Sequence, residues 1–532
     1  MNMSSKRVGI PYILGAVSVI LIYTTYYSIV LPKQDNTIRD DKVPVPKHVK
    51  NKEGEVEVDT TSSSSVKFEA NEAIARDSLK ERLADVKTRI KDVDKLLEGR
   101  KEELEISEAM IKLALKHKTS VKRLIEKFKE VLLTNRTFAI GVLGGSISVG
   151  VGVNGTKGIY ATTLAHYLEK MLGTEVTVGN GAVGATNSYY YGYCFQTHCN
   201  VHNVDLLFWE FAHNDNGNPR GFLGQERLTR MILADLPNQP QLIYINFIGG
   251  KQADRYEECV NNQQNGSLQL SPYYDVPSIS MPDAVCKLVK KYKAGYLFGS
   301  HDGSHPGPEG HDMVAIFLTE FIKEVLIDTI TSLDKELNIM SGAMEQFRIE
   351  DSSHNYTNSD DGKLHQKDLP PILFNTTAIT HPQCWSLMGS EYRPTEMTLT
   401  PQDKFGWQKF TLAKKDYRGD LKQVWHTFRP GAFIEFEVNI PPYRGLKSTI
   451  AITTITLEPD KCGCAKVFLD DEYLETLDCR HHFLVTVVHD VAFNVPPGTY
   501  VLKITTVGEN GFNIASLSTA YEIPDQQPKP KY

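Results

Sequence analysis

Four short polar segments near the middle of the chain carry residue types that could perform hydrolysis. Ser146 lies in Leu-Gly-Gly-Ser-Ile-Ser, Gly184 in Val-Gly-Ala-Thr, and Asn214 in Phe-Ala-His-Asn-Asp. Asp302 and His305 lie three residues apart in a loop rich in glycine and proline. A serine hydroxyl is a weak nucleophile, so it needs a base, a group that orients the base, and donors for the developing oxyanion. These residues could supply all of these parts.

Each segment also has a simpler interpretation. Gly-Gly-Ser is more often a turn than a nucleophile, and Asn-Asp is a common turn pair. Ser148 is a second hydroxyl beside Ser146, and we expect His311 to start the last helix rather than act as the base. One run of tyrosines could either stack on a sugar or pack in the core: Tyr189, Tyr190, Tyr191 and Tyr193. The presence of all four segments in this order favours hydrolysis.

Apolar runs alternate with helical patterns from Asn135 to about Ile327. The expected strands are Phe138–Leu143, Glu175–Val178, Asp205–Glu210, Gln241–Phe247 and Gly295–Phe298. Helices are expected between them, at Ile159–Leu172 and Gln225–Ala234. Short continuous apolar strands separated by helices indicate a parallel sheet covered on both faces. The reactive crevice of such a sheet lies at the carboxyl ends of its strands, where the four polar segments fall.

Over roughly residues 136–327 the chain resembles the SGNH (GDSL-like) hydrolases, a family named for its serine, glycine, asparagine and histidine. The resemblance implies a three-layer α/β/α domain with a central parallel sheet. It implies that Ser146 is the nucleophile, that His305 is the base and that Asp302 orients His305. One departure is Gly145, which stands where the family has an aspartate before the serine.

The resemblance also implies an oxyanion hole made by the backbone N–H groups of Ser146 and Gly184 and the side-chain amide of Asn214. Ala212 and His213 replace the usual Gly-x before that asparagine. The implied activity is a serine esterase that hydrolyses acyl esters, with no cofactor or metal. That the ester is an acetyl group on a glycan is expected from the membrane topology and the appended β domain described below. Two alternatives remain: an O-acyltransferase with the same triad, and a non-catalytic, membrane-anchored glycan-binding protein.

The region Gly9–Leu31 contains no charged residue, and as a helix it would be long enough to cross a bilayer. Lys6 and Arg7 precede it, so the positive-inside rule predicts a single-pass type II protein with a luminal or extracellular catalytic domain. A cleaved signal peptide is the alternative. We predict a cytosolic tail at 1–8, a transmembrane signal anchor at 9–31, a disordered stem at 32–66, a helical or coiled-coil segment at 67–130, the hydrolase domain at 131–345, a linker at 346–369 and a β-sandwich at 370–525.

An apolar seam follows the predicted stem, with residues spaced alternately by four and three. Its members are Leu79, Leu83, Val86, Ile90, Val93 and Leu97. This spacing is typical of a coiled coil, so the helix over 79–111 could form a homodimer. It could also be a helical hairpin that packs on the next domain.

The net charge of −7 and the scattered basic residues disfavour nucleic-acid binding. Five sequons are compatible with a luminal domain: Asn135, Asn154, Asn265, Asn355 and Asn375. In an oxidising compartment the eight cysteines would form disulfides, and Cys194 and Cys199 are close enough for a local bridge. A cluster near the C-terminus could instead hold zinc, although disulfides are expected there: Cys462, Cys464, Cys479, His481 and His482.

The last segment, 370–525, has many short alternating runs separated by Pro-Gly and Gly-rich turns, which predict an all-β sandwich. Its tryptophans could lie in its core, or exposed aromatic residues could stack on sugars: Trp385, Trp407 and Trp425. We expect this domain to fold without the hydrolase domain and to target glycans. The alternative is that it docks on the α/β domain.

Overall fold

The computed structural model describes residues 61–153, 158–215, 220–247, 264–285, 305–346, 368–374, 377–390, 392, 397–412, 422–482 and 484–524. The chain divides into two compact units, residues 1–80 with 332–353 and residues 81–331 with 354–532. The α/β sheet and the C-terminal β domain both belong to the second unit. None of the helices in these ranges is long and apolar enough to span a membrane. The predicted anchor at 9–31 lies outside them and stays a prediction.

A five-stranded parallel sheet forms the centre of the α/β domain. Its strands are β1 (Phe138–Gly144), β2 (Val176–Asn180), β3 (Leu206–Glu210), β4 (Gln241–Asn246) and β5 (Ser278–Ser280). They follow the order β2-β1-β3-β4-β5, and every neighbouring pair is parallel. The central parallel sheet expected from the sequence is confirmed. The two edge strands of the described sheet are β2 and β5, whereas the expected strand at Gly295–Phe298 lies outside the described residues.

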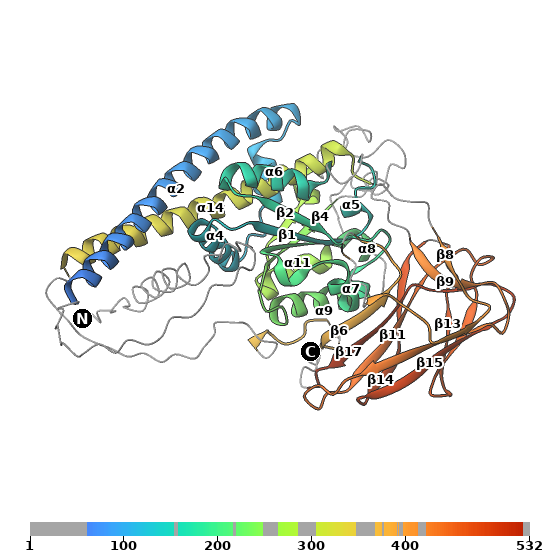
Figure 1. Cartoon of the computed structure of the whole chain (residues 1–532). Coiled ribbons are helices and arrows are strands. Elements are labelled where there is room, and N and C mark those ends of the chain that lie inside the picture. The colour runs from blue at the N-terminus through green and yellow to red at the C-terminus, as the bar shows by residue number, and fades with distance from the viewer. Residues whose placement is uncertain are drawn as a thin grey trace, which may run out of the picture. The chain divides into compact units, whose positions relative to one another are not determined.

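Helices flank this sheet on both faces (Figure 1). On one side lie α6 (Tyr160–Leu172) and α14 (Pro308–Gln346), and on the other α7 (Ser188–His198), α9 (Gly221–Ala234) and α11 (Asn265–Tyr274). Shorter helical turns connect these elements: α5 (Ser146–Val149), η2 (Val201–Asn203), α8 (Ala212–Asp215) and α12 (Met281–Val285). Helix α6 ends where Gly173 adopts a left-handed conformation, as is common at helix C-termini.

The segment predicted as a coiled coil forms three helices, α2 (Thr61–Glu103), α3 (Glu108–Ala114) and α4 (Lys122–Thr134). Helix α2 therefore begins inside the segment predicted to be a disordered stem. Five seam residues are buried within the single chain: Leu83, Val86, Ile90, Val93 and Leu97. Ion pairs join α2 to α14, with Lys101 2.6 Å from Glu320 and Lys323 2.5 Å from Asp94. This packing agrees with the helical-hairpin alternative and leaves the homodimer through 79–111 without support.

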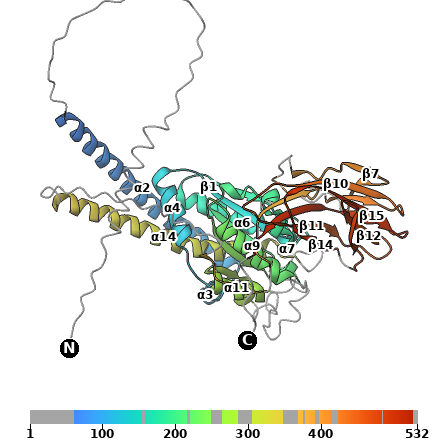
Figure 2. The ribbon, with the colours of Figure 1, turned by 90° about the horizontal axis from the view of Figure 1, so that it is seen from below.

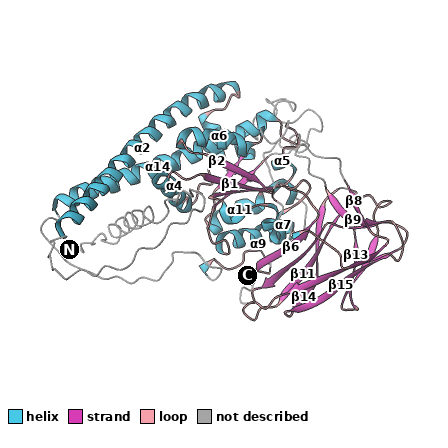
Figure 3. Ribbon diagram, in the orientation of Figure 1, coloured by secondary structure: helices cyan, strands magenta, loops and turns pink. Residues whose placement is uncertain are grey.

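The C-terminal domain consists of strands and loops (Figure 3), in agreement with the predicted all-β domain. Two sheets with strand orders β13-β12-β15-β10-β7 and β14-β11-β17-β6 form its layers (Figure 2). A smaller sheet has the order β16-β9-β8. The strands are β6 (Ile379–Ser386), β7 (Asp403–Phe405), β8 (Gln408–Thr411), β9 (Gln423–Thr427), β10 (Phe433–Ile440), β11 (Ser448–Ile455), β12 (Cys464–Leu469), β13 (Glu472–Asp478), β14 (Thr486–Val495), β15 (Gly498–Val507), β16 (Phe512–Ile514) and β17 (Ser516–Glu522). Trp407 and Trp425 are buried in its core, which favours the packing interpretation for both.

The β domain is bonded to the α/β domain. A disulfide joins Cys194 on α7 to Cys384 on β6, so the local bridge from Cys194 to Cys199 that the sequence allowed does not form, and Cys199 is a buried thiol. The tyrosines of α7 are buried in the same region and do not line an open sugar site. Tyr189 and Tyr193 both donate hydrogen bonds to Asp490 on β14. The docked alternative therefore describes this domain better than an independent module does.

A second disulfide joins Cys462 to Cys479. Oxidised sulfurs are not thiolate ligands, so this pair does not form the zinc site considered from the sequence. Cys464 is a thiol between them in the chain.

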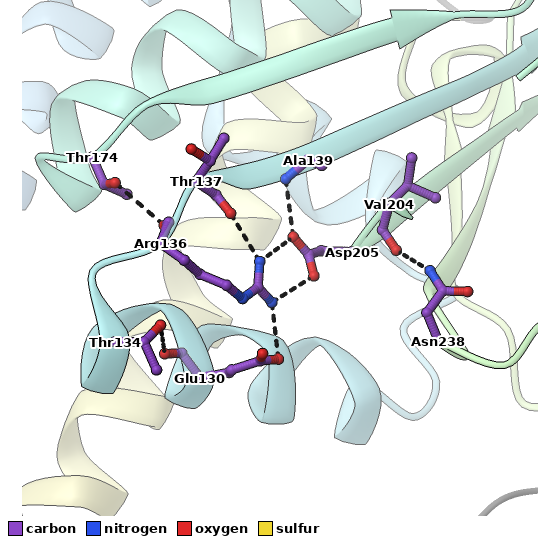
Figure 4. Close-up of polar contacts among 9 residues, drawn as sticks. All are labelled: Glu130, Thr134, Arg136, Thr137, Ala139, Thr174, Val204, Asp205 and Asn238. Atoms are coloured by element: carbon purple, nitrogen blue, oxygen red, sulfur yellow. Dashed lines mark hydrogen bonds and ion pairs between the residues drawn. The ribbon is translucent and has the colours of Figure 1, made fainter. Parts of the chain in front are cut away.

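An ion pair fixes the amino-terminal edge of the parallel sheet (Figure 4). Arg136, just before β1, contacts both carboxylate oxygens of Asp205, at 2.8 and 2.7 Å, and also contacts Glu130 on α4. Asp205 accepts a further hydrogen bond from the backbone N–H of Ala139. Burial disfavours the charged guanidinium, but the hydrogen bonds to Asp205 and Glu130 outweigh it and raise the pKa of Arg136. The pair therefore ties β1, β3 and α4 together.

We predict that Asp205→Ala lowers the free energy of unfolding by about 2–3 kcal/mol, because it leaves a half-buried guanidinium and a backbone N–H without their acceptor. The control is Asp92→Ala, which removes an exposed ion pair with Lys95 on α2 and should cost at most about 0.5 kcal/mol. Urea unfolding of the full chain measures both values. Equal losses in the two variants would contradict this role for Asp205.

Candidate active site

Three adjacent strands bring the candidate residues to one edge of the sheet. Ser146 follows β1, Gly184 follows β2 and Asn214 follows β3, and the sheet order places β1 between the other two. Because the strands are parallel, their carboxyl ends meet at one edge, as expected from the sequence. The side chains of Ser146 and Asn214 and the backbone of Gly184 are partly exposed, although most residues around them are buried. This arrangement leaves polar atoms accessible on an otherwise packed edge.

The turn that carries Ser146 has no room for side chains at the two preceding glycines. A Cβ atom on Gly145 would lie 2.2 Å from Nδ2 of Asn214, and one on Gly144 would lie 2.5 Å from Oγ of Ser148. Real Cβ contacts are never this short, so these glycines are required for the close approach of β1 and the loop after β3. The aspartate that the SGNH motif places at Gly145 would displace Asn214 here.

The hydroxyl of Ser146 contacts an imidazole from a distant part of the chain. Oγ of Ser146 lies 2.8 Å from Nε2 of His305. Gly152 makes this approach feasible, since a Cβ there would lie 2.5 Å from the backbone oxygen of Pro306 and 3.3 Å from Cβ of His305. Gly152 also has a φ of +98°, which favours glycine. In the tautomer with unprotonated Nε2, the serine donates and the imidazole can act as a base.

The two alternative residues, Ser148 and His311, have structural partners. Ser148 is fully buried, and its Oγ lies 3.0 Å from the hydroxyl of Tyr160 and 3.1 Å from Oε2 of Glu210. His311 is buried on α14, and its Nδ1 accepts the backbone N–H of Tyr160. Burial and the nearby His305 lower the pKa of His311 to about 3, so this imidazole is neutral at physiological pH. Ser146 and His305 are the accessible pair.

Three groups that carry N–H donors lie on the segments next to Ser146. Ser146 is the first residue of α5, where backbone N–H groups lack intrahelical partners. A Cβ built on Gly184 would lie 3.7 Å from Cβ of Ser146, so the Gly184 backbone is also close. Nδ2 of Asn214 donates one of its two hydrogens to the backbone oxygen of Thr186 at 2.6 Å. These are the groups that an oxyanion hole requires.

Glu210 is a functional candidate that the sequence reasoning missed. It ends β3 and is fully buried, its carboxyl group accepts a hydrogen bond from the Ser148 hydroxyl at 3.1 Å, and its backbone oxygen accepts the N–H of Gly145 at 3.3 Å. Burial raises the pKa of Glu210 to about 8, although the hydrogen bond from the Ser148 hydroxyl opposes the shift. Glu210 therefore holds the turn on both sides of Ser146. In the sequence, the signal for Glu210 was a single acidic residue at the end of an apolar strand.

Two other acidic residues are close in sequence to the candidate site residues. Asp302, the expected partner of His305, lies outside the described residues. Asp215, next to Asn214, accepts the backbone N–H of Ser188 and the side-chain amide of Gln225, at 3.0 and 2.9 Å. Burial raises the pKa of Asp215 to about 7. Asp215 therefore holds the start of α7 beside the site.

The predicted glycosylation sites are distributed over both described and undescribed regions. Asn135, which ends α4, and Asn265, which begins α11, are exposed. The other three lie outside the described residues: Asn154, Asn355 and Asn375.

Comparison with known proteins identifies a shared two-domain fold. No family model matches the chain, and no curated protein matches its sequence. A solved two-domain esterase, described as active on acetylated mannans, aligns with a TM-score of 0.51 and 16% identity, over 76% of this chain and 96% of its own. Its structure co-crystallised with mannopentaose aligns with a TM-score of 0.52 and 15% identity, over 78% and 99% of the two chains. The α/β domain and the following β domain thus share the fold of an esterase.

We predict that Glu210→Gln changes how stability depends on pH. A carboxyl whose pKa rises from 4.5 to about 8 on folding favours the native state fully below pH 4.5. That contribution is lost as the pH rises toward 8, whereas glutamine does not titrate. The variant should therefore gain stability relative to the wild type between pH 4.5 and 8, by up to several kcal/mol. Urea unfolding across this range measures the difference, and a difference independent of pH would contradict the buried, protonated state.

Proposed function

We propose that this chain is a serine esterase that hydrolyses acyl esters, with acetyl as the expected acyl group and a glycan as its carrier. The observation that carries the proposal is the 2.8 Å contact between Oγ of Ser146 and Nε2 of His305, beside the donors of Gly184 and Asn214. A serine and an imidazole at hydrogen-bond distance, with donors close to the serine, form the arrangement that activates a hydroxyl for acyl transfer.

In the proposed reaction, Oγ of Ser146 attacks the ester carbonyl carbon while Nε2 of His305 takes the hydroxyl proton. The carbonyl oxygen becomes an oxyanion, which accepts hydrogen bonds from the N–H groups of Ser146 and Gly184 and the amide of Asn214. The carbon–oxygen bond to the alcohol then breaks, and His305 returns the proton to the departing alcohol oxygen. Water, deprotonated by His305, attacks the acyl-serine, the bond between the acyl carbon and Oγ of Ser146 breaks, and His305 returns the proton to that oxygen as the acid leaves. Asp302 would orient His305 in this scheme, as the SGNH resemblance implies.

The glycan part of the proposal has separate support. The solved esterase with the same two-domain fold is described as active on acetylated mannans. The predicted type II topology would place the site in the lumen or outside the cell, where the glycans of secreted and surface proteins occur. An O-acyltransferase would use the same serine and histidine, but it would pass the acyl group to a sugar hydroxyl instead of water.

We predict that Ser146→Ala and His305→Ala each lower the turnover of an aryl acetate by at least about 10³-fold. The double variant should lose little more, because the two residues act as one unit. The assay contains no sugar acceptor, so turnover by the wild type identifies a hydrolase rather than an obligate transferase.

The matched control is Ser148→Ala, which removes a buried hydroxyl two residues away. This variant should keep Ser146 reactive, so a fluorophosphonate probe should still label it, whereas Ser146→Ala should not be labelled. Labelling that survives in Ser146→Ala but is lost in Ser148→Ala would reverse the assignment of the nucleophile.

A further inference from the structure

One lysine of the β domain lies beside the candidate nucleophile. A Cβ atom built on Gly184 would lie 3.5 Å from Nζ of Lys422 and 3.7 Å from Cβ of Ser146. The Lys422 ammonium and Cβ of Ser146 are therefore no more than 7.2 Å apart, the sum of these two distances. Lys422 directly precedes β9 and is partly exposed. The β domain thus places a positive charge next to the proposed oxyanion hole.

Hydrogen bonds in both domains hold Lys422 and the Gly184 turn in place. On the β domain, the N–H of Leu412 donates to the backbone oxygen of Lys422 at 2.9 Å, which extends the pairing of β8 with β9. On the α/β domain, the residue after Gly184 accepts a hydrogen bond from the other domain, because the N–H of Thr486 donates to the oxygen of Ala185 at 3.0 Å. Nδ2 of Asn187 donates back to the oxygen of Thr486 at 2.9 Å. The Gly184 turn and the β domain are therefore bonded directly.

The strand pairing at this position does not require a charged side chain. The hydrogen bond from Leu412 uses the main-chain oxygen of Lys422, which any residue provides. The ammonium is a compact, strongly hydrated charge with three donors, and it forms its strongest hydrogen bonds with anionic oxygens. An ester carbonyl at Ser146 would place substrate groups only a few bonds away within reach of Lys422.

We infer that Lys422 makes the site selective for esters that carry an anionic group, such as a carboxylate, close to the ester bond. This inference rests on the proposed esterase function and adds a substrate class to it. The anion could belong to the acyl group, as in the half-ester of a dicarboxylic acid, or to the alcohol, as in an acylated uronic acid. In both cases the charge pair would improve binding before the chemical step, so it would act mainly on KM.

The test uses two pairs of aryl esters, each an anion and its neutral methyl ester. The alcohol side is probed by 4-carboxyphenyl acetate and methyl 4-acetoxybenzoate. The acyl side is probed by mono(4-nitrophenyl) adipate and methyl 4-nitrophenyl adipate. The pair in which the wild type prefers the anion identifies the side of the ester that faces Lys422. Turnover of any of the four esters supports the proposed esterase, whereas the absence of turnover on all four would refute that function whatever the role of Lys422.

We predict that Lys422→Gln raises KM for the preferred anionic ester about tenfold and leaves kcat/KM for its neutral partner unchanged. Lys422→Arg should retain the preference, and added salt should weaken it in the wild type. The control Lys466→Gln removes the same charge from an exposed position on β12 and should change neither ester. An equal loss on both members of a pair, or no change on either, would overturn the inference.

Discussion

The candidate site depends on a close approach between two loops that leaves no space for a single methyl group. Gly145 packs against the amide of Asn214, and Gly152 packs against the segment that carries His305. A side chain at either glycine would separate the serine from its proposed base or from one of its oxyanion donors. Glu210 holds the same turn, since its backbone oxygen accepts the N–H of Gly145 and its carboxyl group accepts the hydroxyl of Ser148. The geometry of the candidate site therefore depends on two glycines, Gly145 and Gly152, and on the buried residue Glu210.

Much of the α/β domain could be predicted because its signals are local. Apolar runs predicted both ends of four of the five described strands to within two residues. Strand β1, for example, is expected at Phe138–Leu143 and observed at Phe138–Gly144. The parallel order then determined that Ser146, Gly184 and Asn214 would meet. Strand β5 was missed because three residues, Ser278–Ser280, are too few to show a periodicity.

The features that could not be predicted depend on contacts between distant parts of the chain. The local spacing of Cys194 and Cys199 suggested a bridge, but the partner of Cys194 is contributed by β6. The seam of α2 has the spacing of a dimeric coiled coil, although α14 of the same chain supplies ion pairs along it. Periodicity reports that a helix has an apolar face and does not report what covers it. Likewise, the proximity of Lys422 to Gly184 follows only from the docking of two domains.

The disulfide between α7 and β6 also affects the order in which cysteines can pair during synthesis. Cys194 and Cys384 are separated by 190 residues, so a ribosome that adds roughly 5–20 residues per second produces the second cysteine roughly 10–40 seconds after the first. During that interval the Cys194 thiol has Cys199 as a near neighbour in the chain, while most of the β domain has not yet been synthesised. A newly made chain in an oxidising compartment would therefore form the short, non-native loop first and would need thiol–disulfide exchange to reach the native pairing. The native bond can therefore form only after β6 has been synthesised.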